Sequence, residues 1–311
     1  MTASGHKPIF FYHIPKTGGD SVIDSAVTAL GRPKIFGFSD NDPDRISARL
    51  EPVLGKNCPF QLFHAHISPA RLKPNSAFVS ATVLRDPADR LMSHFCYVYE
   101  NRFNGFRISE YFRRPHLIGR SQFTYADLLA WMREFGWDNY QTRFLSASFH
   151  QTLSERTVGS AVGMFESTEI VGLTDNLGPF FEQVGHTLAV RLQPQIRNAS
   201  NRNLLAMSEE ECRHLRREHL HFDYLLFDAA KEICAKRRPA ASIAMPAFAE
   251  EALQAPGFAS YVRWFRFNSA REVAIVTARR VLGPLRRIWE RLLIATTTKS
   301  VVESGVRSPV A

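Results

Sequence analysis

The sequence contains few cysteines and no hydrophobic run long enough to span a membrane. The four cysteines form no C-x-x-C pair; they are Cys58, Cys96, Cys212 and Cys234. This usage indicates a reducing compartment and disfavours both a disulfide framework and a zinc site. At the amino end only Lys7 and a short apolar run precede the first motif, so we expect neither a signal peptide nor a membrane anchor. The sequence therefore predicts a cytoplasmic enzyme of bacterial origin.

Acidic residues are too few to balance the basic ones, but the imbalance is concentrated in one segment. The formal net charge is +9. Residues 260–299 contain nine Lys and Arg against Glu272 and Glu290, a net +7, which leaves about +2 for the rest of the chain. The main body thus lacks a generally basic surface, and we expect no nucleic-acid partner.

Apolar runs alternate with helix-compatible segments over the first 235 residues. The segments with strand character are 9–12, 34–38, 60–66, 77–84 and 169–173. The segments expected to be helical are 42–54, 86–101, 125–135, 139–145, 175–188 and 222–235, and a capping box at Ser208 and Glu211 begins another. This alternation predicts an α/β fold with a central parallel sheet, and the helices within 109–165 are expected to form a lid or a substrate-facing insertion.

The carboxyl-terminal part differs in composition from the rest. Three prolines in an alanine-rich stretch mark a linker, so we expect a domain over 1–236, a linker over 237–259 and an extension over 260–311. The extension reads as a basic amphipathic helix. It could dock on the core, join a second subunit, or lie on an anionic bilayer as a peripheral contact at the inner membrane surface.

The first motif spans residues 9–21, with the sequence I-F-F-Y-H-I-P-K-T-G-G-D-S. It predicts a strand, a turn with one cation and two glycines, and a helix that begins near Asp20. Gly18 and Gly19 let backbone N–H groups approach a ligand closely, Lys16 adds a point charge, and the helix start adds its partial positive charge. The loop is suited to an anion, although the lysine precedes the glycines, unlike in the G-x-x-x-x-G-K-[ST] nucleotide loop. The alternative is a turn that merely joins a strand to a helix.

The second motif is V-L-R-D-P-A-D-R-L-M-S-H-F at residues 83–95. A buried strand ends at Arg85, Asp86 caps the following helix, and Ser93 comes about two helical turns later. A guanidinium and a hydroxyl can thus converge on one anion, for which the planar fork of arginine is well suited. An ordinary capped helix is the alternative.

A candidate base lies at the end of the strand expected over 60–66. His66 would share the carboxyl edge of the sheet with Lys16 and Arg85, and histidine has a pKa suited to proton transfer near neutrality. His64 lies deeper on the same face and is expected to support it. A structural strand-end histidine is the alternative for His66.

Together these motifs resemble those of sulfotransferases that use 3′-phosphoadenosine 5′-phosphosulfate (PAPS), in particular the bacterial and Golgi carbohydrate branch. The resemblance covers about residues 8–235 and implies a three-layer, P-loop NTPase-like fold. In the family, the first motif binds the 5′-phosphosulfate and the second binds the 3′-phosphate. The cofactor-binding residues implied here are Lys16, Thr17, Gly18, Gly19, Ser21, Arg85 and Ser93, with Arg197 and Ser200 in a loop, residues 197–202, that closes over the nucleotide.

The resemblance also implies the chemistry. His66 matches the second histidine of an H-x-H segment, which is the base, and Lys16 would stabilise the leaving oxygen. The product would be adenosine 3′,5′-bisphosphate, the acceptor a hydroxyl of a small molecule, carbohydrate or glycolipid, and no metal would be required. The stretch at 139–145 also resembles bacterial members and is either acceptor-lining or a simple amphipathic helix. Asp20 departs from the family pattern, which has a small hydroxyl residue there.

Two other classes of function stay open at this stage. A nucleotide-dependent kinase would need a magnesium-binding hydroxyl after the loop lysine, which Thr17 supplies, and a second acidic site, for which only Asp86 follows a buried strand. A non-catalytic nucleotide-binding, membrane-associated protein would fit Asp20 and the basic extension.

Overall fold

The computed structural model describes residues 7–38, 42–54, 58–72, 76–99, 117, 120–193 and 204–237. Arg197 and Ser200 lie outside the described residues, as do residues 238–259 of the expected linker and the whole extension over 260–311. The expected roles of these segments stay predictions.

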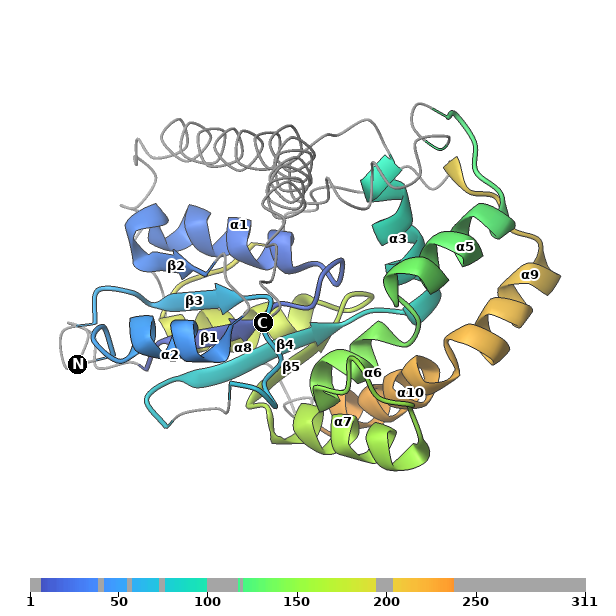
Figure 1. Ribbon diagram of the computed structural model, residues 1–311. Helices are drawn as coiled ribbons and strands as arrows, with labels where there is room; N and C mark the ends of the chain where they lie inside the picture. Colours follow the sequence, from blue (N-terminus) through green and yellow to red (C-terminus); the bar gives the residue numbers. More distant parts are fainter. Residues whose placement is uncertain are drawn as a thin grey trace, which may run out of the picture. The chain divides into compact units, whose positions relative to one another are not determined.

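A parallel five-stranded sheet lies at the centre of the described part (Figure 1). Its strands are β1 (Ile9–Tyr12), β2 (Ile35–Gly37), β3 (Leu62–Ala65), β4 (Val79–Leu84) and β5 (Ile170–Leu173). Their order is β2-β3-β1-β4-β5, and every neighbouring pair is parallel. The predicted α/β class with a parallel sheet is therefore confirmed, and β1 lies in the middle with β3 and β4 on either side.

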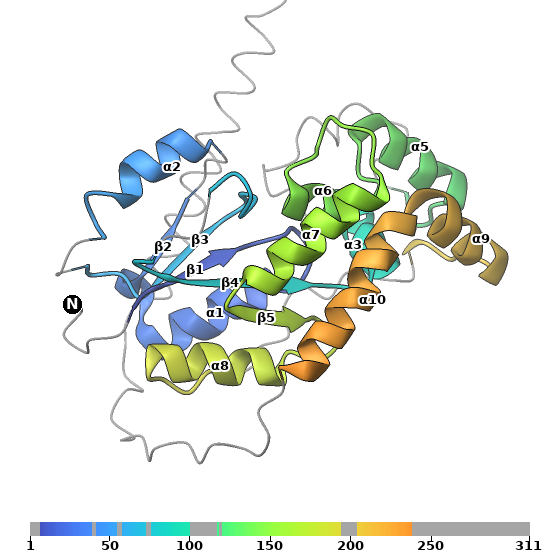
Figure 2. The same cartoon turned by 90° about the horizontal axis from the view of Figure 1, so that it is seen from below.

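Helices cover both faces of this sheet (Figure 2). Alternate strand residues point to opposite faces, so Ile9 and Phe11 pack with α1 (Gly19–Leu30) and α8 (Gly178–Leu188). Phe10 and Tyr12 pack instead with a second set of helices. These are α2 (Pro43–Leu50), α6 (Tyr140–Ser146), α7 (Glu155–Ser167) and α10 (His221–Lys236). The result is a three-layer α/β arrangement.

A separate apolar cluster joins the helices beside the sheet. It includes residues of α3 (Pro87–Tyr99) and α5 (Tyr125–Phe135), and it is centred on the buried Trp131. Leu215 of the short π-helix η4 (Leu215–His219), which follows α9 (Glu209–His214), also belongs to this cluster, as does Leu220 just beyond η4. A short 3-10 helix, η1 (Arg32–Lys34), leads into β2.

Local signals placed most element boundaries to within a few residues. Asp42 caps α2 as expected, since its side chain accepts hydrogen bonds from the N–H groups of Asp44 and Arg45. The capping box predicted at Ser208 and Glu211 is also present. Within the described segments, no helix combines the length and the apolar character needed to cross a membrane.

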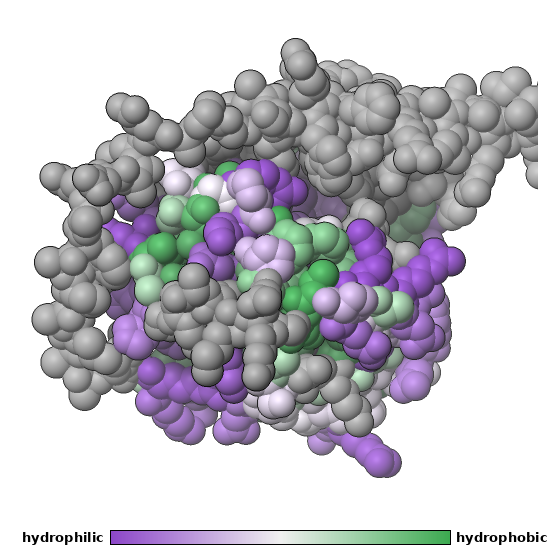
Figure 3. All heavy atoms as spheres, turned by 90° about the vertical axis from the view of Figure 1, so that its left-hand side faces the viewer, coloured by the Kyte–Doolittle hydropathy of each residue, from purple (hydrophilic) through white to green (hydrophobic). Residues whose placement is uncertain are grey.

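The strands begin on the side that faces left in Figure 1 and end on the opposite side. Figure 3 looks at that left side, where hydrophobic residues gather near the centre with hydrophilic residues around them. The motif residues described next follow the strands and so belong to the opposite, carboxyl edge.

Candidate functional site

The predicted site residues follow three adjacent strands. Lys16 comes after β1, Arg85 after β4 and His66 after β3. The chain leaves β1 toward β2 on one side of the sheet, whereas from β4 it continues toward β5 on the other. Crevices at such switch points, beyond the carboxyl ends of parallel strands, are where α/β proteins bind ligands. The fold thus brings the two anion motifs and the candidate base to one edge.

The loop between β1 and α1 has an unusual backbone. Lys16 has a φ of 72°, which is rare for a residue with a side chain, and Gly18 has a φ of 91°. The buried Thr17 holds the turn together, because its hydroxyl donates to the Ile14 carbonyl at 2.9 Å and its carbonyl accepts from Thr174 Oγ1 at 2.7 Å. The loop is therefore braced from within and from the end of β5.

Helix α1 begins directly at this turn. Gly18 is its N-cap in the left-handed conformation, and no side chain caps the helix. The leading N–H groups of an α-helix have no intrahelical acceptor and lie at its partially positive end, which favours an anion. Asp20 lies in the first turn and is exposed, so it is not the N-cap. The helix starts one residue earlier than expected because glycine adopts the left-handed φ easily.

Gly19 is required for another reason. A Cβ at this position would lie 2.0 Å from the His13 ring, a distance that no packing could tolerate. The absence of a side chain thus lets the buried imidazole of His13 pack directly on the start of α1. Ser21, also expected to bind the anion, is a partly exposed residue of the first turn, and its N–H donates to the Gly18 carbonyl at 3.0 Å.

Arg85 joins the two predicted motifs. Its Nη1 donates to the Lys16 carbonyl at 3.3 Å, and its Nη2 lies 3.9 Å from the Asp89 carboxylate. Asp86 caps α3 as predicted, accepting a hydrogen bond from the Asp89 N–H at 3.0 Å. The guanidinium therefore lies between the loop and the first turn of α3, with 17% of the side chain exposed.

Gln141 fixes the backbone of Arg85, a role that sequence reasoning missed. The buried Gln141 amide accepts from the Arg85 N–H at 2.9 Å and donates to the Arg85 carbonyl at 2.8 Å. The start of α6 is in turn held by the buried Asp223, whose carboxylate accepts from the N–H groups of Gln141 and Thr142. Burial raises the pKa of Asp223, opposed by Arg90 and these backbone donors. For the 139–145 stretch, these inward contacts favour the amphipathic-helix interpretation.

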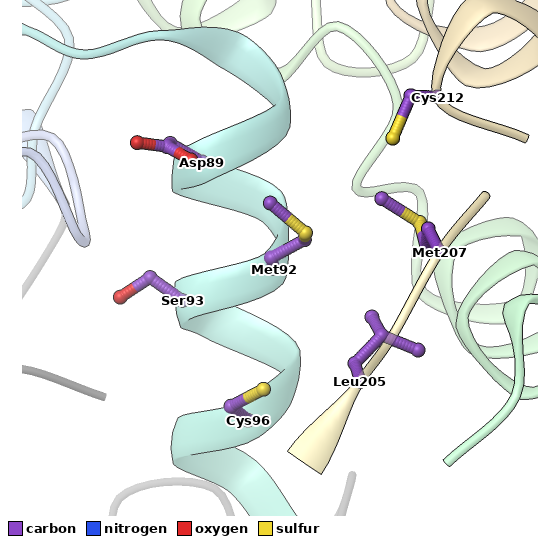
Figure 4. Close-up of a pocket in the computed structure, with 7 residues that line it drawn as sticks. All are labelled: Asp89, Met92, Ser93, Cys96, Leu205, Met207 and Cys212. Carbon is purple, nitrogen blue, oxygen red and sulfur yellow. The ribbon is translucent and has the colours of Figure 1, made fainter. Parts of the chain in front are cut away.

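Ser93 lies one helical turn beyond Asp89 on α3, and Figure 4 shows both side chains projecting to the same side of the helix. Ser93 is buried, with 5% of its surface exposed. A cavity of about 220 Å³ adjoins it, lined also by Asp89, Met92, Cys96, Leu205, Met207 and Cys212. Asp89, which pairs with Arg85, and Ser93 therefore lie on one side of α3, and the convergence of Arg85 and Ser93 on one anion stays a prediction.

His66 is exposed at the end of β3 and is oriented by the backbone carbonyl of His13, the residue after β1. Its Nδ1 lies 2.8 Å from the His13 carbonyl oxygen, and the ring centroids of His66 and His13 are 4.4 Å apart. A carbonyl oxygen can only accept, so Nδ1 carries the proton in this contact. In the neutral ring Nε2 is then the basic nitrogen, which is the tautomer that a general base needs.

His64 supports this edge from inside the sheet. Its ring packs against Gly37 of β2, where a Cβ would lie 2.5 Å from Nε2. Burial, followed by the charges of His66 and Arg32, lowers the pKa of His64 to about 3. Burial likewise lowers the pKa of His13 well below its usual value, with smaller effects of His66, His64 and Lys16. Both rings are therefore neutral at physiological pH.

This predicts acid sensitivity in a defined pH window. Between about pH 6.5 and 5 the unfolded chain binds protons at His13 and His64 that the folded protein does not bind, so the free energy of unfolding should fall as the pH falls. Each histidine contributes up to about 1.4 kcal/mol per pH unit. Urea denaturation at several pH values gives the free energy of unfolding as a function of pH. Its slope should be shallower for His64→Gln than for the unsubstituted protein, and unchanged for His150→Gln, which replaces an exposed histidine. Equal slopes for the unsubstituted protein and both variants would contradict a neutral His64 in the folded protein.

Neither a model of a known protein family nor a curated protein sequence matches this chain. Its function must therefore be argued from the residues and geometry of this edge of the sheet.

Proposed function

We propose that the protein is a sulfotransferase that transfers the sulfuryl group of PAPS to a hydroxyl of a carbohydrate or glycolipid acceptor. The observation that carries the proposal is the contact between the two anion motifs, in which Arg85 Nη1 donates to the Lys16 carbonyl. PAPS is a nucleotide with anionic groups at two ends, and it requires two neighbouring anion sites. The motif resemblance and this contact support the same assignment.

The donor set fits such a co-substrate. The loop offers backbone N–H groups at the start of α1 and the Lys16 ammonium, which suit the phosphosulfate. Arg85 and Ser93 suit the 3′-phosphate, since a guanidinium and a hydroxyl both donate to phosphate oxygens. The Arg85 guanidinium would then interact with both the Asp89 carboxylate and the 3′-phosphate.

When bound, PAPS supplies the sulfuryl group and a nucleotide leaving group. His66 takes the proton of the acceptor hydroxyl at Nε2, and the acceptor oxygen bonds to sulfur as the bond between sulfur and the phosphate oxygen breaks. Lys16 places positive charge beside that phosphate oxygen, where negative charge develops. Catalysis then rests on proton transfer, positioning and charge neutralisation.

The geometry of Thr17 disfavours the kinase alternative. Its side chain is fully buried, and its hydroxyl donates to the Ile14 carbonyl within the loop. A hydroxyl in this position stabilises the turn and is not presented toward a metal-bound phosphate. Turnover of PAPS with hydroxylated acceptors would distinguish the proposal from a kinase and from a non-catalytic nucleotide-binding protein.

Replacing Arg85 tests the proposal most directly. Arg85→Ala should weaken the binding of adenosine 3′,5′-bisphosphate by about 1.5 kcal/mol or more. The substitution removes the charged guanidinium that donates hydrogen bonds to the 3′-phosphate. Calorimetry measures the dissociation constant, and circular dichroism checks that the variant is folded. Arg213→Ala is the matched control. The Arg213 side chain is 71% exposed and pairs with Glu209 on the protein surface. An unchanged dissociation constant for folded Arg85→Ala would refute the 3′-phosphate assignment.

A further inference from the structure

Tyr97 contacts the loop lysine from α3. The Lys16 ammonium nitrogen lies 3.3 Å from the centroid of the Tyr97 ring, the geometry of a cation–π interaction. Tyr97 is four residues beyond Ser93 and eight beyond Asp89, so the same strip of α3 that contains the second motif also contacts the first. No sequence motif pointed to this residue.

Lys16 is held at its backbone as well as at its ammonium. The Arg85 guanidinium donates to its carbonyl, and the turn keeps its φ at 72°. Such a left-handed conformation persists only where surrounding contacts determine it. The Tyr97 ring acts on the flexible four-carbon side chain, which in a partly exposed lysine can adopt many rotamers, and restricts it.

We infer that Tyr97 is a positioning residue that holds the Lys16 ammonium ready for an anion at the loop. The ring faces one side of the ammonium and accepts no hydrogen bond in the way an oxygen does, so the N–H donors directed elsewhere can bind phosphate or sulfate oxygens. Holding the side chain in one orientation before binding reduces the rotamer entropy that anion binding would otherwise lose. The inference deepens the proposed function, because it concerns the lysine assigned to the phosphosulfate loop.

The first test is a double-mutant cycle on the full chain with inorganic phosphate as the probe. Tyr97→Leu should weaken phosphate binding by about threefold to tenfold, as expected for a cation–π contact, whereas Tyr97→Phe keeps the ring and should change it less than about twofold. In a Lys16→Ala background, Tyr97→Leu should cause no further loss, because the ring then has no ammonium to hold. Additive losses, or tighter binding by Tyr97→Leu, would overturn the inference.

The second test detects the contact between Tyr97 and Lys16 directly, by NMR of the unsubstituted protein. The ε-methylene protons of Lys16, assigned by their absence in Lys16→Ala, should show an upfield ring-current shift that Tyr97→Phe keeps and Tyr97→Leu removes. The shift should persist when phosphate is added. Its absence in the free protein, or its loss on phosphate addition, would show that Tyr97 does not hold the bound lysine.

These tests separate the inference from the proposed function. A protein that binds phosphate with the predicted dependence on Tyr97, yet neither binds adenosine 3′,5′-bisphosphate nor turns over PAPS, retains the inference and contradicts the sulfotransferase proposal. A protein that turns over PAPS with Tyr97→Leu as active as Tyr97→Phe retains the proposal and contradicts the inference.

Discussion

Replacing His66 by alanine should lower kcat with PAPS and a hydroxylated acceptor by about 100-fold or more, the range typical of a lost general base. Nε2 of His66 is the nitrogen that would take the acceptor proton, because Nδ1 donates a hydrogen bond to the His13 carbonyl. Nucleotide binding should be unchanged, since no anion-binding role is assigned to this side chain. Steady-state kinetics and calorimetry with adenosine 3′,5′-bisphosphate measure the two quantities separately.

Two further substitutions distinguish a base from a structural histidine. His66→Asn can still donate a hydrogen bond to the His13 carbonyl but cannot take a proton, so it should fold normally and remain as inactive as His66→Ala. His64→Ala should instead lower stability or expression, because the His64 ring fills space against Gly37. An active His66→Ala, alongside an inactive variant of a carboxylate at the same edge, would place the base elsewhere.

The sequence predicted the sheet and most helices because their signals are local. The pattern over residues 60–66 indicates a strand where β3 lies, the continuous apolar run before Arg85 indicates the buried β4, and a side-chain cap marks the start of α2. The parallel order of the strands then places the residues after β1, β3 and β4 at one edge. This is why a pattern of residues was enough to locate Lys16, His66 and Arg85 relative to one another.

The contacts that complete the site could not be predicted, because they join distant parts of the chain. Gln141 binds the backbone of Arg85 across 56 residues, and Thr174 binds the Thr17 carbonyl across 157 residues. A glutamine in a polar stretch and a threonine after a strand give no signal that they fix a loop. Tyr97 is similar, since an aromatic residue on a helix ordinarily indicates core packing. The constraint on Gly19 is similar, because it comes from the ring of His13 and not from a local turn signal.

The electrostatic setting of Lys16 explains why its removal should affect the rate more than binding. Negative charge on the phosphate oxygen that leaves sulfur grows toward the transition state, so a cation beside it is worth more there than in the ground state. In the proposed function several groups share ground-state binding of the nucleotide, among them the N–H groups at the start of α1 and the guanidinium of Arg85. The loss of one ammonium should therefore weaken binding only modestly.

Lys16→Ala should accordingly lower kcat by about 100-fold, the size of effect seen when one donor to a developing oxyanion is removed. Alanine keeps the same backbone constraint at a φ of 72° as lysine does, so the loop should retain its conformation. Lys16→Arg should recover part of the rate by restoring a cation, and Lys34→Ala, an exposed lysine outside the site, should be fully active. Single-turnover kinetics at saturating PAPS give the rate of the chemical step, and titration with adenosine 3′,5′-bisphosphate gives the affinity. If Lys16→Ala loses only affinity and keeps its rate at saturation, Lys16 is a binding cation, and the charge on the leaving oxygen must be stabilised by another group at this edge of the sheet.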